Sequence, residues 1–481
     1  MKILLINPPI ISLNPVISSL FFNSPPLGIL YIAAVLEKNK IDVKVIDAAL
    51  ERLSINDLIN RILSYNPDVV GITSTTFSSS SAIEVAKQIK IAKSSIKIVI
   101  GGSHVSAVPE DVLSNNCFDF GVIGEGEFTF LELVQNINKE SDLLKNINGI
   151  IYRDKNNNII KTLPRLLIQN LDILPFPARH LVPIHKYKPQ PNDRRDIPKI
   201  SLISSRGCPY QCIFCGKSVF GISYRSFSEQ YIISEMKYVM ENFQAKDIAF
   251  IDSLFTVSVE RVEKICKEIL KNKLKISWTC TIRSNVIQDK NILKLMKNSG
   301  CWRIRVGIES GNEKILKLIK KEIDLEHLKK VVSWADEIGL QPKGFFMIGH
   351  FTENINTIKE SINLAKNLAL KDITLQINTP LPSTEQLQNC TNYGKLLGDL
   401  TNCSLFKPIF TPNSLTTNEL EYWFKRFYRE FYLRPVIFLR HLKHIKSIKD
   451  VIKYIKAFNL IIYLFFVNRR INLCIKKQKQ Q

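Results

Sequence analysis

The sequence predicts an α/β protein that begins with a parallel, doubly wound sheet. Short β-branched runs alternate with helical patterns through the first 145 of the 481 residues. Strands and helices that alternate at this spacing are typical of a parallel sheet with helices on both faces. The composition, 45% hydrophobic and 23% charged, excludes a mostly disordered or fibrous chain. The length suggests about two to four domains.

Residues 1–145 are expected to form this first domain, with a flavodoxin-like sheet. Two segments between the strands repeat apolar residues every three or four positions, which gives each helix one stripe to pack on the sheet. The stripes are Leu27, Leu30, Tyr31 and Ala34, and then Ala82, Ala86 and Ile89. The expected strands are Lys2–Ile6, Asp42–Ile46, Asp68–Ile72, Lys97–Ile100 and Phe120–Ile123.

Small and polar residues follow three of the expected strands, at Thr73–Thr76, Gly101–His104 and Gly124–Glu127. Parallel sheets bind ligands at the carboxyl ends of their strands. Glycines let the backbone approach a bulky ligand, and hydroxyl groups offer hydrogen bonds. Each loop alone is also explained by the turn that it makes, but the three together predict one ligand site.

Residues 146–198 are expected to form a linker. A hairpin is predicted from Gly149 to Thr162, and proline-rich and charged stretches follow it. Alternation of strands and helices resumes at Ile200 and continues to about residue 412, so a second domain is expected over residues 199–412.

Three cysteines in one short loop carry the strongest chemical signal. Cys208, Cys212 and Cys215 follow the strand at Ile200 with the spacing C-x3-C-x2-C. Three such thiolates can bind three irons of a 4Fe-4S cluster and leave the fourth iron open to a small molecule. A structural zinc site normally takes four ligands from paired residues, and no second pair has a suitable spacing. The other seven cysteines are scattered singly, which indicates core or surface thiols in a reducing compartment.

This motif, with Phe214 at its aromatic position, resembles that of radical S-adenosylmethionine (SAM) enzymes with an N-terminal cobalamin-binding domain. The resemblance covers residues 1 to about 412. It implies that Cys208, Cys212 and Cys215 bind the cluster, whose open iron chelates the amino and carboxylate groups of SAM. One electron then cleaves SAM to methionine and a 5′-deoxyadenosyl radical, which abstracts a substrate hydrogen. The implied fold of residues 199–412 is a partial (β/α)6 barrel.

Later segments resemble the strands that bind SAM in this family. Asp252 stands in the second-strand segment near the amino group of SAM, where many members have two adjacent acids, but Ser253 follows it here. Arg283 and Glu309 lie in segments that face the carboxylate and the ribose of SAM. A carboxylate can accept from ribose hydroxyls and an arginine can hold a carboxylate, and a structural ion pair is the alternative for both residues.

The segment that contains Met347 and Gly349 resembles the strand that binds adenine in this family. Members usually continue with Leu-Pro-Gly-Glu-Thr, whereas this chain has His350, Phe351, Thr352, Glu353 and Asn354. We expect the strand to be intact and the turn after it to differ.

The resemblance of the first domain is to cobalamin-binding domains, and it leaves two alternatives: cobalamin bound without a protein histidine under the cobalt, or a domain that has lost cobalamin. Domains that supply this histidine have Asp-x-His-x-x-Gly after the second strand, and here Ala49 stands at the histidine position. His104 follows a different strand and is expected to be a loop residue. The positions that the resemblance assigns to the pocket for the nucleotide tail of cobalamin are Ser74, Thr75, Gly101, Gly102, Gly124 and Glu125.

The resemblance implies an enzyme that transfers a methyl group to an unactivated carbon and uses two SAM molecules for each turnover. An oxidative cyclase of the anaerobic magnesium-protoporphyrin monomethyl ester type is the alternative. A sensor that binds cobalamin or a cluster without turnover is a third hypothesis. The implied partners are a small-molecule or biosynthetic-intermediate substrate and an electron donor such as flavodoxin or ferredoxin. No catalytic residue beyond the cofactor ligands is assigned.

Residues 413–481 are expected to form a basic helical region. Residues 421–481 contain fifteen Lys or Arg and three Asp or Glu. These 61 residues therefore carry 12 of the 22 excess positive charges. An apolar stripe in residues 440–456 predicts a helix that packs on the barrel, with peripheral contact to an anionic membrane as the alternative. We expect no nucleic acid partner. With no signal peptide pattern at the start, a cytoplasmic location is expected.

Overall fold

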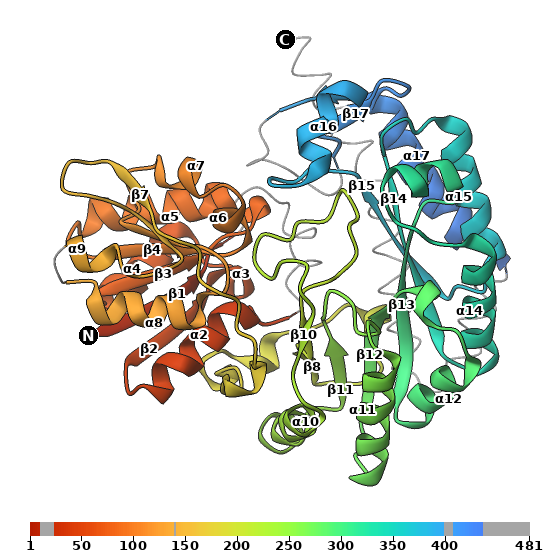
Figure 1. Cartoon of the computed structure of the whole chain (residues 1–481), viewed down its shortest axis with the longest axis horizontal. Coiled ribbons are helices and arrows are strands. Elements are labelled where there is room, and N and C mark those ends of the chain that lie inside the picture. Colours follow the sequence, from red (N-terminus) through yellow and green to blue (C-terminus); the bar gives the residue numbers. More distant parts are fainter. Residues whose placement is uncertain (10–23, 139–140, 399–406, 436–481) are drawn as a thin grey trace.

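Two sheets built mainly from parallel strands organise the protein, and they lie side by side in Figure 1. The computed structural model describes residues 1–9, 24–138, 141–398 and 407–435. One sheet lies in the first 161 residues, and the other spans residues 199–377. The predicted α/β class is confirmed.

The strand order in the first sheet is β2-β1-β3-β4-β5-β6-β7. The first five strands run parallel in the predicted flavodoxin-like order. The predicted hairpin is confirmed, and its strands β6 and β7 extend this sheet in the antiparallel sense. The strands are β1 (Lys2–Asn7), β2 (Asp42–Asp47), β3 (Val69–Thr73), β4 (Lys97–Gly101), β5 (Phe120–Val122), β6 (Ile150–Arg153) and β7 (Ile159–Lys161).

Helices cover both faces of the first sheet because both faces are apolar. Successive side chains of a strand point to opposite faces, so Leu5 packs with α2 and α8 while Leu4 packs with α4 and α5. Both predicted helical stripes are confirmed, in α2 and α5. The helical segments are α2 (Leu27–Lys38), α3 (Ala48–Glu51), α4 (Ile55–Tyr65), η1 (Thr76–Ser78), α5 (Ser79–Ala92), α6 (Ser103–Ala107), α7 (Pro109–Leu113), α8 (Gly126–Asn136) and α9 (Ser141–Leu144).

Short 3-10 turns follow the first sheet through the proline-rich segment, and the second sheet then begins. The turns are η2 (Leu171–Ile173), η3 (Arg179–Leu181), η4 (Ile184–Lys186) and η5 (Pro191–Asp193). The division of the chain at residues 145, 198 and 412 stays a prediction.

The second sheet is a curled row of parallel strands in the order β15-β14-β13-β12-β11-β8, with helices on its outer side (Figure 1). These strands and helices confirm the predicted partial (β/α)6 barrel. The strands are β8 (Lys199–Leu202), β11 (Asp247–Phe250), β12 (Ser277–Ile282), β13 (Cys301–Glu309), β14 (Gln341–Ile348) and β15 (Asp372–Ile377). The helical segments are α10 (Glu229–Phe243), α11 (Val259–Lys271), η6 (Ser284–Val286), α12 (Lys290–Asn298), α13 (Glu313–Leu318), α14 (Leu325–Glu337) and α15 (Ile355–Asn367).

The last described helix closes the edge of the barrel at β15. Tyr428 in this helix accepts a hydrogen bond from the Leu375 amide at 3.0 Å and donates one to the Leu375 carbonyl at 3.1 Å. The predicted stripe at residues 440–456 lies outside the described residues, so packing and membrane contact both stay predictions. The elements after β15 are α16 (Glu385–Tyr393), β16 (Gly394–Leu396), β17 (Phe410–Pro412) and α17 (Thr417–Tyr432).

The two sheets share one hydrophobic interface through α2. Leu27, Leu30 and Tyr31 on this helix belong to the same buried cluster as the core of the barrel. The ring of Tyr31 stacks on Phe227 with 6.4 Å between centroids. The interface brings the carboxyl ends of strands from both sheets around one cavity.

Candidate active site

The cluster loop, defined as residues 206–220, starts just beyond the end of β8. The short strands β9 (Ser205–Arg206) and β10 (Arg225–Ser226) pair beside it. The buried carboxylate of Asp252 accepts hydrogen bonds from the Ser204 amide and the Ser205 hydroxyl, both at 2.7 Å. Asp252 therefore fixes the chain directly before the loop, and its predicted contact with the amino group of SAM stays a prediction.

The three thiols on this loop fit a cluster site. Burial raises the pKa of the Cys215 thiol, and negative charge on Cys212 and Cys208 raises it further. Cys215 therefore lies near both other thiols, and bound iron would relieve the repulsion between its thiolate and theirs. Among the described residues no three Cys, His, Asp or Glu side chains could hold one metal ion. A 4Fe-4S cluster does not require that, because each cysteine binds a different iron.

Arg283 lies against the cluster loop. Its guanidinium stacks on the Tyr210 ring at 3.7 Å and lies 4.0 Å from the Cys212 sulfur. It also donates to the carbonyls of Lys321 and Glu322, which belong to the segment after α13. Arg283 therefore joins the end of β12 to the cysteine loop, while its predicted contact with the SAM carboxylate stays a prediction.

Glu309 ends β13 and pairs with a residue that the sequence did not indicate. Its carboxylate accepts from the Lys321 ammonium at 2.8 Å. Gly307 makes room for this pair, because a Cβ there would lie 2.7 Å from both charged groups. Lys321 carries no motif that could have revealed it. The predicted structural ion pair therefore exists for Glu309, and Arg283 binds backbone carbonyls instead.

A cavity of about 430 Å³, called here the SAM cavity, lies beside the cluster loop. Three residues predicted to bind SAM line it, namely Phe214, Glu309 and Met347, and Cys215 opens onto it. Asp252, Arg283 and Gly349 do not line it. Phe77, in the turn η1 that follows β3 of the first sheet, also lines the cavity, and the sequence analysis did not predict it as a site residue. The other lining residues are Gly216, Phe345, Phe346, Thr374, Gln376, Ile377, Asn378, Thr379 and Leu381. Apolar walls with a few convergent polar groups are typical of a cofactor site.

The unusual turn after β14 contains two buried titratable side chains. Glu353 accepts hydrogen bonds from the backbone amides of Gly349 and His350, and its burial raises the pKa of Glu353 to about 8. The His350 ring is fully buried 6.2 Å from the Phe214 ring, and its burial lowers the pKa of His350 to about 3. Neither ring nitrogen has a partner among the described residues. The predicted strand is intact, and the histidine adds an unsatisfied polar group.

A second cavity, of about 320 Å³ and called here the tail cavity, lies where the two sheets meet. Gly101, Gly102, Gly124 and Glu125 line it, and their contact with the nucleotide tail of cobalamin stays a prediction. Ser74 and Thr75 do not line it. Ser74 lies behind Gly102, where a Cβ would be 2.5 Å from the Ser74 carbonyl oxygen, and the Thr75 hydroxyl lies 3.1 Å from that of Ser78 in the capping box of η1.

Other residues of the tail cavity escaped the sequence analysis. Gly71, in the middle of β3, also lines it and lets Leu5 and Phe130 pack against the strand, because a Cβ there would lie 2.6 Å from Leu5 and 3.1 Å from Phe130. Arg206, directly before the Gly-Cys of the motif, reaches the cavity from the barrel. A mostly apolar lining with a few charged side chains suits the base and the ribose phosphate of a nucleotide tail.

Four buried charges form one cluster beside the tail cavity, and three of them, Arg206, Glu125 and Glu127, line it. Arg206 donates to Glu125 at 2.7 Å and to Glu127 at 2.5 Å, and Arg225 donates to Glu125 at 2.7 Å. Burial alone would lower the pKa of Arg206, but the charges of Glu127 and Glu125 hold that pKa above its usual range. Glu125 thus joins the two sheets, a role that the resemblance did not indicate.

Ala49 stands where related domains have the histidine that lies under the cobalt, and it belongs to α3. Asp47, before it, accepts from the Leu50 amide at 3.0 Å and from the Tyr187 hydroxyl at 2.7 Å. His104 lies in α6, so the expected loop placement was wrong. It is buried there, and its ring nitrogen Nδ1 lies 3.3 Å from the Thr76 hydroxyl.

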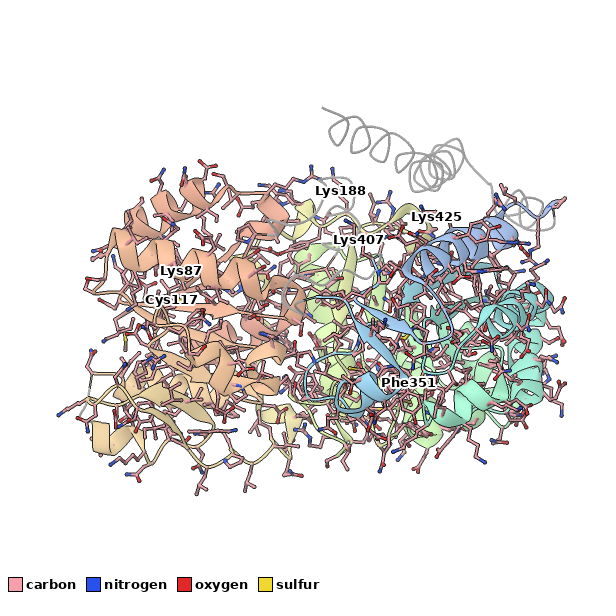
Figure 2. The ribbon with its side chains drawn as sticks, turned by 90° about the horizontal axis from the view of Figure 1, so that it is seen from above. Lys87, Cys117, Lys188, Phe351, Lys407 and Lys425 are labelled. Carbon is pink, nitrogen blue, oxygen red and sulfur yellow. The ribbon has the colours of Figure 1, made fainter. Side chains whose placement is uncertain are left out.

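Most of the remaining cysteines are core thiols, as predicted. Cys266, Cys280, Cys301 and Cys390 are buried in the barrel unit. Cys117 is buried beside Lys87 among the elements of the first sheet, far from Phe351 on the side of the barrel (Figure 2). Cys403 and Cys474 lie outside the described residues.

Comparison with known proteins agrees with this geometry. The B12 binding domain model matches residues 13–134, and the radical SAM superfamily model matches residues 202–365. An uncharacterised methyltransferase from Pyrococcus horikoshii is 34% identical over 444 residues, which cover 92% of this chain and 94% of that protein. An anaerobic magnesium-protoporphyrin IX monomethyl ester cyclase from Rubrivivax gelatinosus is 25% identical over 420 residues, covering 85% of this chain and 74% of the cyclase.

The fold also matches a solved structure of OxsB, a cobalamin-dependent SAM radical enzyme, with aqua-cobalamin and SAM bound. The TM-score is 0.73 at 18% identity, and the match covers 97% of this chain and 72% of OxsB. The chain therefore belongs to the cobalamin-binding radical SAM enzymes. Membership of these families implies cobalamin, SAM and the 4Fe-4S cluster of radical SAM enzymes as its cofactors. Among the described residues, no helix combines the length and the apolar character needed to span a membrane.

The first prediction concerns the cluster. Anaerobically reconstituted protein should contain about four irons and absorb near ~400 nm, and the combined Cys208→Ala, Cys212→Ala and Cys215→Ala variant should lose both. A variant with Cys117→Ala, which removes a core thiol of the first unit, serves as the control and should keep both. Stoichiometric zinc without iron in the wild-type protein would contradict the assignment.

The second prediction concerns the tail cavity. Gly71→Val should reduce cobalamin binding at least tenfold, because its side chain would push Leu5 and Phe130, which line the tail cavity, into the space of the ligand. The overpacking should also lower the free energy of unfolding by about 1–3 kcal/mol. Gly28→Ala is the control, since this residue lines the same cavity but its Cβ would meet nothing within 4 Å. Visible absorbance after gel filtration measures binding. Normal binding by Gly71→Val would show that the ligand does not use this space.

The third prediction concerns His350. His350→Leu, which restores the residue usual in the family, should raise the free energy of unfolding by about 1–3 kcal/mol at neutral pH, because it removes buried polar atoms without partners.

The stabilisation by His350→Leu should grow as pH falls from 6.5 toward 3. In this range the unfolded histidine binds a proton that the folded one, with its pKa of about 3, does not bind. The increase should be about 1.4 kcal/mol per pH unit. Denaturant unfolding at several pH values measures it, with His185→Leu at an exposed site as the control. A difference that does not change with pH would show that the imidazole is solvated or paired.

Proposed function

We propose that this enzyme transfers a methyl group to an unactivated carbon of a small molecule or biosynthetic intermediate. The observation that carries the proposal is that one loop lines both cavities. Arg206, Val219 and Phe220 line the tail cavity, while Phe214 and Cys215 of the same loop line the SAM cavity. Two cofactors on either side of one loop are placed to act on one substrate. The similarity to the methyltransferase from P. horikoshii supports this reaction.

The residues of this chain hold, orient and shield the cofactors. When bound, the cluster supplies the electron that cleaves SAM to a radical, and cobalamin supplies the methyl group. Cys208, Cys212 and Cys215 are the proposed iron ligands. Glu309, held by Lys321, is placed to accept from the ribose hydroxyls of SAM. Phe77, Phe214 and Met347 give the SAM cavity apolar walls that exclude water.

The remaining proposed SAM contacts lie around this cavity. Arg283 is proposed to approach the SAM carboxylate, Asp252 its amino group and Gly349 its adenine. For Asp252 the support is weakest, because Ser204 and Ser205 occupy both carboxylate oxygens. We also propose an acidic electron carrier such as flavodoxin or ferredoxin as the donor, since the net charge of +22 favours negative partners.

The fourth prediction tests the reaction. The reconstituted enzyme, supplied with methyl-deuterated SAM, a reductant and a metabolite extract of the source organism, should form 5′-deoxyadenosine and S-adenosylhomocysteine. One metabolite should gain the deuterated methyl group. The cysteine triple variant is the control and should form no 5′-deoxyadenosine.

Two other results of this experiment would contradict methyl transfer. A metabolite that loses hydrogen and gains a ring without label would identify an oxidative cyclase, the reaction named in the relative from R. gelatinosus. A complete lack of 5′-deoxyadenosine from intact, iron-loaded protein would contradict radical chemistry.

A further inference from the structure

The charge cluster at the tail cavity, defined as Arg206, Arg225, Glu125 and Glu127, has two donors left over, the Nε atoms of Arg206 and Arg225. Arg206 uses its two terminal nitrogens to bind the two glutamates. Its Nε has no partner among the described residues, although the side chain is only 2% exposed. Burying an N–H group without an acceptor costs free energy. This geometry indicates an acceptor that the protein itself does not supply.

Two aromatic rings hold Arg206 at the lining of the tail cavity, which Arg225 does not line. The guanidinium lies between the rings of Tyr31, at 5.3 Å, and Phe220, at 5.1 Å, which hold its plane. All three residues line the tail cavity. The nucleotide tail of cobalamin carries a phosphate, which is a strong acceptor for an arginine.

Arg206 is also tied closely to the cluster. It is two residues before Cys208, and the intervening Gly207 adopts φ +82°. A Cβ on Gly207 would lie 2.1 Å from the Ser223 carbonyl oxygen, so the turn packs closely against the segment that contains Ser223. A movement of Arg206 toward a ligand would therefore be transmitted through the closely packed Gly207 to Cys208, the first iron ligand.

We propose that Arg206 is a positioning residue that binds the nucleotide tail of cobalamin through Nε and so couples occupancy of the tail cavity to the geometry of the cluster loop. This inference rests on the proposed binding of cobalamin in the tail cavity. Glu125 and Glu127 hold the guanidinium in place from the first sheet. Arg225, opposite Arg206 on β10, shares Glu125 and balances the charge of the cluster.

The test uses the full-length, cluster-reconstituted protein and aquacobalamin as the probe. Titration measures cobalamin affinity, and electron paramagnetic resonance of the reduced cluster measures its geometry with and without cobalamin. In the wild-type protein cobalamin should bind and should shift the cluster spectrum. In Arg206→Met the affinity should fall at least tenfold, and the cluster spectrum should no longer respond to saturating cobalamin.

A buried arginine at the other end of the barrel provides the matched control. Arg303 lies 3.3 Å from Asp372, is 3% exposed and also has an Nε without a described partner, yet it lines neither cavity. Arg303→Met should keep both the affinity and the spectral response. Equal losses in the two variants would overturn the proposal, because general destabilisation would explain both.

Two further results keep the test decisive. If Arg206→Met does not fold, Arg206→Lys is used to test the proposal. Lysine keeps the positive charge but lacks the Nε–H donor of arginine. A loss of affinity of threefold or more supports the proposal, and wild-type affinity overturns it. If the wild-type protein binds no cobalamin, the proposed function fails at this site. If it binds normally and Arg206→Met does too, the proposed role of Arg206 is overturned while the proposed function stands.

Discussion

A buried pairing of opposite charges joins the two sheets at the start of the cluster loop. Arg206 from the barrel meets Glu125 and Glu127 from the first sheet, and the side chains are almost fully removed from water. Buried charges are tolerated only when they are paired, and loss of one partner leaves an uncompensated charge. The pairing thus fixes one relative position of the sheets. The tail cavity exists only in that arrangement, because residues of both sheets line it.

The sequence predicted the elements better than the side chains that assemble the site. Strands such as β1 and β4 are buried on both faces, and their continuous apolar runs located them within one residue. The C-x3-C-x2-C loop was also recognisable, because its chemistry depends on local spacing. Lys321 pairs with Glu309 only after the barrel has formed, and no local pattern could indicate that contact.

The same reasoning explains the partial success at the tail cavity. The glycines at the ends of β4 and β5 line it because parallel strands end at one edge. Ser74 does not, since Gly102 allows the two loops to approach until Ser74 is covered. Gly71 lies inside a strand, where a glycine usually marks close packing. Here it lets Leu5 and Phe130 pack close to β3, and these two side chains line the tail cavity, which the sequence alone does not reveal.

The turn after β14 shows how the protein departs from its family without losing the site. Glu353 still binds the backbone amides of the turn, so the usual glutamate keeps a structural role. His350 replaces the usual leucine and remains neutral, because burial depresses its pKa. The adjoining strand keeps its register with β15 through Ile348. Changes in this turn are therefore tolerated as long as the amide contacts are kept.

The central claim is that the cluster and cobalamin lie on the two sides of one loop. Electron paramagnetic resonance of enzyme that contains both the reduced cluster and cobalt(II) tests it most directly. The account predicts that each signal is broadened by the other spin and relaxes faster than in protein with one cofactor. A spectrum that is the simple sum of the two separate signals would contradict it.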